Sequence, residues 1–69
     1  MPPYPYGEVC VHADGSKIMI IGYGRTAGYG AAMVLKSGPV LTGTVPGKHI
    51  QVSIGALLVE TIWKRAWMA

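Results

Sequence analysis

The sequence predicts a mostly β fold, a small single-domain barrel or sandwich of about four to six short strands. Two pairs of short apolar runs flank the turn signals Asp-Gly and Pro-Gly, and a glycine-rich segment joins the two pairs. With 69 residues, the chain is short enough that it forms one domain at most and buries only a small core.

Residues 1–7 predict an extended N-terminal arm. They read Met-Pro-Pro-Tyr-Pro-Tyr-Gly, and prolines at this density favour a polyproline-like backbone over regular structure. The arm carries two tyrosines, Tyr4 and Tyr6. It can lie on a neighbouring subunit or pack on its own domain, and both interpretations stay open. Residues 8–69 then form a single small β-rich domain.

The segment from residue 8 to residue 21 predicts a β-hairpin. Asp14-Gly15 separates two strand-like runs, and this dipeptide is typical of a two-residue hairpin turn. The resulting register pairs Val9 with Ile20 and Val11 with Ile18 on one face, and Glu8 with Ile21, Cys10 with Met19 and His12 with Lys17 on the other. We expect the first face to be core and the second, mixed face to be open to an interface.

Residues 22–30 contain the tripeptide Gly-Tyr-Gly twice. Glycine at this density predicts a loop or a bulged strand, because ordering glycine costs much backbone entropy. The spacing does not match the dinucleotide-binding fingerprint. Tyr23, Arg25 and Tyr29 form one candidate stacking surface for single-stranded nucleic acid. The favoured interpretation is a connection whose tyrosines cover the edges of the core.

The middle of the chain predicts a further strand and a second hairpin. Residues 31–36 are a short apolar run that ends at the breaker Ser-Gly-Pro. Residues 40–45 and 48–54 flank Pro46-Gly47, which suits a type II turn. In this register Leu41, Val45, Ile50, Val52 and Ile54 share one face, and Thr42, Thr44, His49, Gln51 and Ser53 share a polar one.

The C-terminal residues 55–69 fit two patterns. The residues Leu58, Val59, Ile62, Trp63, Ala66 and Trp67 form a helical stripe. A helix with Ser53 as its cap is narrowly favoured, and a strand from Ile50 through Trp63 is the competing prediction. On a helix, Trp63 and Trp67 stack beside two cations and could anchor a partner. Filling the small core is the slightly favoured role for these tryptophans.

Few residues suggest catalysis or ligand chemistry. His12 and His49 lie far apart in the sequence without a third ligand at metal spacing. No serine, histidine and acid constellation is visible in the linear order, and Cys10 stands among apolar strand residues, where a cysteine is usually a buried hydrophobe. We therefore expect no catalytic residues, no metal site and no cofactor.

Composition favours dependence on a partner. Hydrophobic residues make up 51% of the chain and charged residues 13%, with a net charge of +3 from dispersed cations. The charged fraction is about half that of ordinary soluble domains, so part of the surface is expected to face another molecule. A single cysteine rules out an internal disulfide. Oligomerisation or docking on a host is then the expected source of additional stability.

These observations favour a non-enzymatic structural subunit of a larger assembly, such as a virion capsid cement, decoration or connector protein, or an accessory subunit of a complex. The alternatives are a small nucleic-acid-binding β-barrel and a small inhibitor that caps a partner surface. No signal peptide or transmembrane segment is predicted, which favours a cytoplasmic or virion location. The candidate interface residues are Tyr4, Tyr6, Tyr23, Arg25, Tyr29, Trp63 and Trp67.

Overall fold

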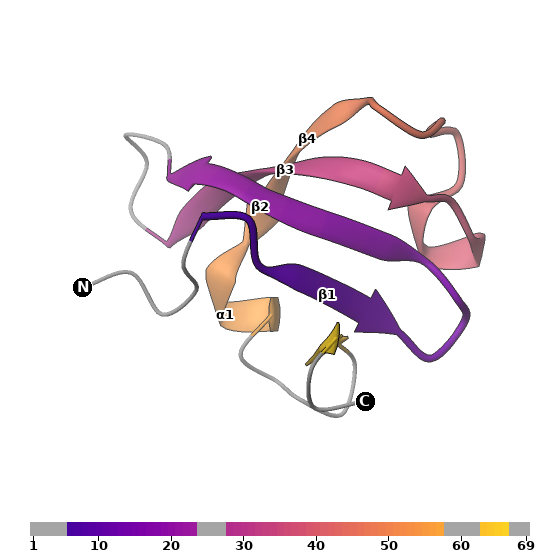
Figure 1. The fold of residues 1–69 in the computed structure, drawn as a ribbon, viewed down its shortest axis with the longest axis horizontal. Helices are drawn as coiled ribbons and strands as arrows, with labels where there is room; N and C mark the ends of the chain where they lie inside the picture. The colour runs from indigo at the N-terminus through magenta and orange to yellow at the C-terminus, as the bar shows by residue number, and fades with distance from the viewer. Residues whose placement is uncertain (1–5, 24–27, 58–62, 67–69) are drawn as a thin grey trace.

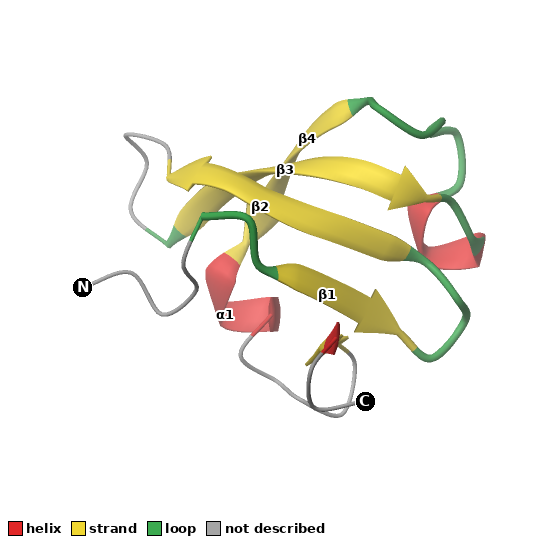
Figure 2. Ribbon diagram, in the orientation of Figure 1, coloured by secondary structure: helices red, strands yellow, loops and turns green. Residues whose placement is uncertain are grey.

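A computed structural model describes residues 6–23, 28–57 and 63–66 of the chain (Figure 1). The strands are β1 (Val9–His12), β2 (Lys17–Tyr23), β3 (Tyr29–Lys36), β4 (His49–Ser53) and β5 (Trp63–Arg65), with a 3-10 helix η1 (Pro39–Leu41) and a short helix α1 (Ile54–Leu57). The five strands form one antiparallel sheet in the order β4-β3-β2-β1-β5 (Figure 2). The mostly β class and the strand number are confirmed, but the sheet is open rather than a closed barrel.

The β1–β2 hairpin exists as predicted, but its turn contains three residues instead of two. The His12 N–H donates to the Ser16 carbonyl over 2.8 Å, and Gly15 has a φ of 94°, which is typical of a turn that ends in a left-handed glycine. The additional turn residue shifts the register by one, so that Cys10 pairs with Ile18. Such a shift exchanges the two faces of one strand relative to the other. The predicted cross-strand pairs are therefore wrong.

The β2–β3 hairpin contains two irregularities. The predicted strand at residues 31–36 is confirmed as part of β3, and the glycine-rich segment begins as a bulged end of β2. The register shifts between Ile20 and Gly22, so Ile21 is the additional residue of a bulge. A second shift, between Lys17 and Ile18, makes Leu35 the additional residue of β3. Bulges of this kind increase the local twist of the sheet.

The predicted second hairpin is wrong, because residues 40–45 do not form a strand. Pro39 begins η1, and Gly43 and Gly47 adopt left-handed backbone angles that turn the chain. The hydroxyl of Thr44 donates to the Leu41 carbonyl over 2.6 Å, which is a local bond that competes with strand pairing. The polar residues of β4 are exposed as expected, but β4 pairs with β3.

The core lies on one side of the sheet, here called the inner face. It contains Cys10, Ile18, Ile20, Ala32, Ile54 and Trp63, all between 0% and 8% exposed. Trp63 belongs to β5, which pairs with β1, so the helical prediction is wrong at this residue. A strand satisfies backbone groups on the open edge of β1 that a helix would leave unpaired. Trp67 lies outside the described residues.

Candidate interaction surface

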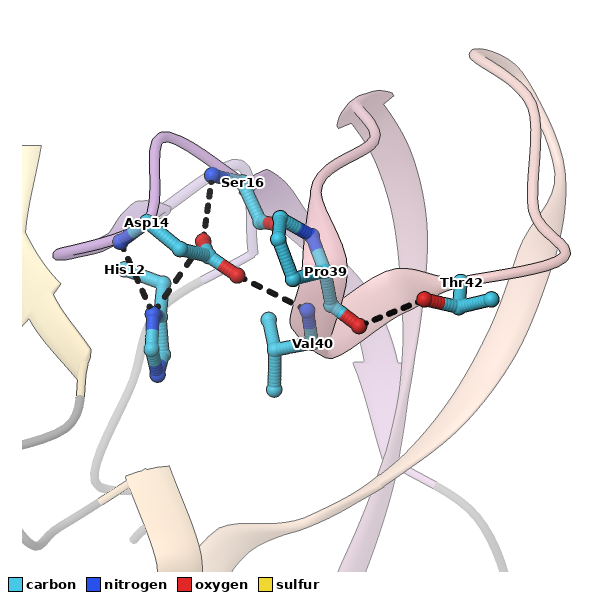
Figure 3. Close-up of polar contacts among 6 residues, drawn as sticks. All are labelled: His12, Asp14, Ser16, Pro39, Val40 and Thr42. Atoms are coloured by element: carbon cyan, nitrogen blue, oxygen red, sulfur yellow. Dashed lines mark hydrogen bonds and ion pairs between the residues drawn. The ribbon is translucent and has the colours of Figure 1, made fainter.

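The carboxylate of Asp14 fastens the β1–β2 turn to η1 (Figure 3). One oxygen accepts the Ser16 N–H over 2.8 Å, and the other accepts the Val40 N–H over 2.7 Å. Partial desolvation opposes ionisation of this carboxyl group, but the hydrogen bonds from Ser16 and Val40 outweigh it and lower the pKa of Asp14 from 3.8 to about 2. The carboxylate thus holds two segments together that are 26 residues apart in the chain.

His12, Asp14 and Ser16 form a serine, histidine and acid cluster that the linear sequence did not indicate. Nδ1 of His12 lies 3.1 Å from Oδ1 of Asp14, and the backbone N–H of Asp14 donates to the same Nδ1 over 3.1 Å. The imidazole packs edge-on against Trp63, with ring centroids 5.1 Å apart. Ser16, however, is 0% exposed, and its hydroxyl has no hydrogen-bond partner among the described residues. The cluster joins the β1–β2 turn to Val40 of η1 through Asp14, and we call these contacts the clasp. The buried serine hydroxyl is not accessible to a substrate.

Gly38 packs directly against Ser16 and Asp14 of this clasp. A Cβ at residue 38 would approach the Ser16 hydroxyl more closely than any van der Waals contact allows. The conformation of Gly38 is extended, with a φ of −157°, so the requirement for glycine here comes from space and not from backbone strain. The breaker predicted at residues 37–39 thus has a packing role in addition to ending β3.

An apolar pocket of about 190 Å³ opens on the inner face between η1, β4 and β5. Leu41, Ile50, Val52 and Trp63 contribute to its lining, and Val40 at the same site is 47% exposed. Ligand pockets for small molecules are usually about 300 Å³ or larger. The pocket suits a single apolar side chain of a partner better than a cofactor.

The opposite side of the sheet, here called the outer face, is also apolar. Burial alternates along β2 and β3, so that the residues between the buried positions point away from the core. The apolar residues of the outer face are Val9, Val11, Met19, Ile21, Ala31, Met33 and Leu35; the polar His49 and Gln51 of β4 lie on the same face, because they pair with Met33 and Ala31. None of these side chains is buried, and Leu35 is 37% exposed. The described helices pack on the inner face, where Leu41 and Ile54 join the core.

The outer face has an apolar centre. Val9 pairs with Met19, and Met19 pairs with Met33, so three apolar side chains lie side by side across three strands. Methionine is frequent on surfaces that adapt to a partner, because its side chain is unbranched and polarizable. An apolar strip of this kind on a sheet is typical of a contact surface.

A row of lysines crosses one end of the outer face. Lys64 on β5 pairs with Val11, Val11 pairs with Lys17, and Lys17 pairs with Lys36. All three lysines are exposed, and among the described residues none of them has an acidic partner. Like charges directly opposite each other destabilise a sheet, so the Lys17–Lys36 pair of this row is a local cost to the isolated chain. A partner that carries carboxylates would remove that cost.

The two acidic residues that the structure describes, Glu8 and Asp14, lie away from the lysine row, and each has other polar partners. Glu8 contacts Arg65, with 3.4 Å between Oε1 and Nε, and Asp14 belongs to the clasp. Cys10 pairs with Arg65, follows Glu8 by two residues on the same face, and is 1% exposed. Burial raises the pKa of its thiol, and the nearby Glu8 carboxylate raises it further, while Arg65 lowers it. The predicted role of Cys10 as a buried hydrophobe is confirmed.

Of the predicted interface residues that the structure describes, the three tyrosines lie at one end of the sheet and Trp63 lies apart from them in the core. Tyr6 is 69% exposed and stacks on Tyr23, with ring centroids 6.1 Å apart. Tyr29 is 43% exposed at the start of β3, and Trp63 is 8% exposed in the core. Burial makes Trp63 a core residue rather than a surface anchor. The remaining three candidates, Tyr4, Arg25 and Trp67, lie outside the described residues.

The outer face itself was not predicted. Its signal was the alternation of residues along β2 and β3, which places Met19 and Met33 between buried neighbours. The error of one residue in the first turn assigned Val9 and Val11 to the core and so concealed this surface. Correct assignment required the turn length, which Asp-Gly alone does not determine.

Within the described ranges, no three histidine, cysteine, aspartate or glutamate side chains gather closely enough to hold a metal ion. The described helices are also too short to cross a lipid bilayer. Comparisons with protein-family models, with curated proteins and with solved structures found no match to this chain.

Proposed function

We propose that this chain is a non-enzymatic structural subunit of a larger assembly and that it contacts a protein partner through the outer face. The observation that carries the proposal is an apolar sheet face on which no side chain is buried. Apolar surfaces with a polar rim commonly mark protein interaction sites. The small core supports the same proposal, because a domain of this size gains stability when a second apolar face becomes covered.

The lysine row indicates the chemistry of the partner. A matching surface presents carboxylates opposite Lys17, Lys36 and Lys64 and an apolar strip opposite Met19 and Met33. A virion capsid or connector, or another multi-subunit complex, is the kind of assembly proposed, with a virion or cytoplasmic location. The apolar strip favours a protein over a nucleic acid, since nucleic-acid surfaces use aromatic stacking. The centre of the outer face around Met19 and Met33 has no aromatic residue, and Tyr29 lies at the end of β3 opposite to Lys36.

The test compares the wild type with Met33→Lys and with Val45→Lys in the cells that naturally make the chain. Val45 is 65% exposed in the β3–β4 connection and lies off the outer face, so it controls for added charge. Density-gradient sedimentation measures the size of the particle that contains each variant. We expect the wild type and Val45→Lys to sediment in a large particle and Met33→Lys to sediment as the free chain.

Circular dichroism of the purified variants separates loss of contact from loss of fold. Met33→Lys is expected to keep the wild-type spectrum, because Met33 is not a core residue. Wild-type protein that sediments only as a free, cooperatively folded monomer would overturn the proposal. That result would direct attention to the inhibitor alternative.

The lysine row also favours one second candidate, a nucleic-acid-binding domain. Against it, Tyr29 and Lys36 lie at opposite ends of β3, about 23 Å apart at the usual rise of a strand. Stacking residues and cations are therefore separated. Fluorescence anisotropy with a single-stranded oligonucleotide at low and high salt tests this candidate. Strongly salt-dependent binding that Lys17→Gln and Lys36→Gln weaken would support it.

A further inference from the structure

Among the described strands, β4 lies at one end of the sheet and pairs on one side only, with β3. The Val34 N–H donates to the Lys48 carbonyl, and the Ile54 N–H donates to the Gly28 carbonyl, each over 2.8 Å. These bonds fix which residues of β4 face β3, because hydrogen-bonding residues alternate along an antiparallel ladder. Residues 48, 50, 52 and 54 bond to β3. His49 and Gln51 consequently direct their N–H and C=O groups to the open edge.

Strand β4 itself, His49–Ser53, lacks the features that usually prevent edge pairing, and the one neighbouring charge is Lys48, directly before the strand. Natural edge strands are commonly protected by a charged side chain, a proline or a bulge. The sequence of β4 is His-Ile-Gln-Val-Ser, with no charged acid or lysine and no proline. Its pairing with β3 runs in a single register from His49 to Ser53. The side chains of His49 and Gln51 are exposed and polar, and they leave the backbone beside them accessible.

We propose that β4 pairs antiparallel with β4 of a second copy of this chain, about a two-fold axis between the two Ile50 residues. In this register His49 of each copy lies opposite Gln51 of the other, and each such pair exchanges both backbone hydrogen bonds. The pairing therefore uses the outward groups of His49 and Gln51. This inference extends the proposed structural role but rests on the sheet edge rather than on the outer face.

The side chains of β4 are compatible with this arrangement. The two Ile50 residues occupy a non-hydrogen-bonded position, where opposing Cα atoms lie about 4.5 Å apart and side chains make their closest contact. Ile50 is half-buried and lines the apolar pocket, so the contact brings apolar surface of both copies together. Lys48 lies opposite Val52 of the second copy. Like charges do not lie opposite each other across the axis, whereas Lys17 and Lys36 do so in the lysine row.

A second copy fits this edge better than an arbitrary strand. A two-fold contact requires that one surface complements itself, and β4 does so in hydrogen bonding, in apolar contact and in charge. The axis stands perpendicular to the sheet, so both outer faces lie on the same side of the dimer. The dimer would present a continuous ten-stranded sheet, with twice the outer-face area for the partner.

The experiment compares the wild type with Gln51→Pro and Gln51→Thr by light scattering over micromolar to millimolar concentrations. Proline removes the outward N–H of residue 51 without removing a bond to β3, and proline is tolerated on a strand edge in this orientation. Threonine keeps the N–H and favours strands. We expect dimers for the wild type and Gln51→Thr, and half that molar mass for Gln51→Pro with an unchanged circular dichroism spectrum.

A wild type that stays monomeric at all concentrations, or a folded Gln51→Pro variant that remains dimeric, would overturn the inference. If Gln51→Pro fails to fold, hydrogen exchange of the wild type decides the question. The amides of His49 and Gln51 must then gain protection as concentration rises, and unprotected amides at every concentration would refute the dimer.

Met33→Lys separates this inference from the proposed function. Met33 pairs with His49, but its side chain lies on the outer face and leaves the outward N–H and C=O groups of His49 and Gln51 unchanged, so Met33→Lys is expected to keep the dimer mass. Loss of the dimer with an intact large particle would contradict the edge contact alone. A dimer that never enters a large particle would contradict the outer-face contact alone.

Discussion

The two faces of the sheet are built from the same strands and contain similar residues, yet the described segments outside the sheet cover only one of them. Ile18 and Ile20 of β2 are 0% exposed on the inner face, whereas Met19 between them is only partly buried on the outer face. The difference lies in what packs on each side, because η1, α1 and Trp63 all contribute to the inner face. An apolar residue pattern therefore shows that a face is suited to burial, but not that its own chain buries it.

Ile20→Ala is the change with the largest expected effect on this comparison. Ile20 is fully buried in the core, and truncation of such a residue lowers the free energy of unfolding by about 2–5 kcal/mol. A domain of this size is expected to be largely unfolded by such a loss. Urea denaturation followed by circular dichroism measures the change. An unfolding free energy within about 0.5 kcal/mol of wild type would mean that the inner face is not the core.

Gly38→Ala tests the clasp that joins η1 to the inner side of the first hairpin. The added Cβ would collide with the buried Ser16 hydroxyl, and overpacking of this kind costs about 1–3 kcal/mol. Ser16→Ala removes the colliding atom, and that hydroxyl has no hydrogen-bond partner among the described residues. We expect the double variant to be more stable than Gly38→Ala alone. Additive losses in the double-mutant cycle would contradict the described packing.

Asp14→Asn tests the electrostatic part of the same clasp. The pKa of Asp14 is about 2 in the folded chain against a usual value of 3.8, so its ionised form stabilises the fold above about pH 4. This contribution is lost as the pH falls from about 4 to about 2. We expect the wild type to be more stable than Asp14→Asn at neutral pH and the difference to shrink over that window. Thermal unfolding at a series of pH values measures it, and a constant difference would contradict the lowered pKa.

Met19→Ala has the smallest expected effect and provides the matched comparison with Ile20→Ala. The two residues are neighbours on β2, but Met19 lies on the outer face. Its truncation is expected to change the unfolding free energy of the isolated chain by less than about 1 kcal/mol. Chemical denaturation of both variants under the same conditions gives the ratio of their two losses in unfolding free energy. Equal losses at the two residues would show that the outer face is covered in the isolated chain.

The sequence predicted the parts of this fold that depend on short-range patterns. The Asp14-Gly15 hairpin, the strand at residues 31–36 and the burial of Cys10 follow from turn chemistry and local composition. The register of the first hairpin did not follow, because two-residue and three-residue turns share the same dipeptide. A strand reaching Trp63 was only the competing prediction, since β5 depends on the open edge of β1, and the residues of the pair His12–Trp63 are 51 residues apart in the chain.

The candidate surface was harder to predict than the fold for a physical reason. A contact surface formed by cross-strand neighbours depends on register, and the lysine row exists only because Val11 pairs with both Lys17 and Lys64. In the linear sequence the same lysines are dispersed and give no cluster. The tyrosines, in contrast, are prominent in the sequence, and the described ones gather at one end of the sheet. Tyr6 stacks on Tyr23 there, and Tyr29 precedes Gly30, the strand partner of Tyr23.

The buried thiol of Cys10 can serve as a probe of how often the sheet of this small protein opens. With 1% of the residue exposed and a raised thiol pKa, a disulfide reagent reacts only with molecules in which β1 has separated from its neighbours. The labelling rate then reports how often the sheet opens. Any contact that covers the outer face or the β4 edge should slow that rate, although neither contact touches the sulfur.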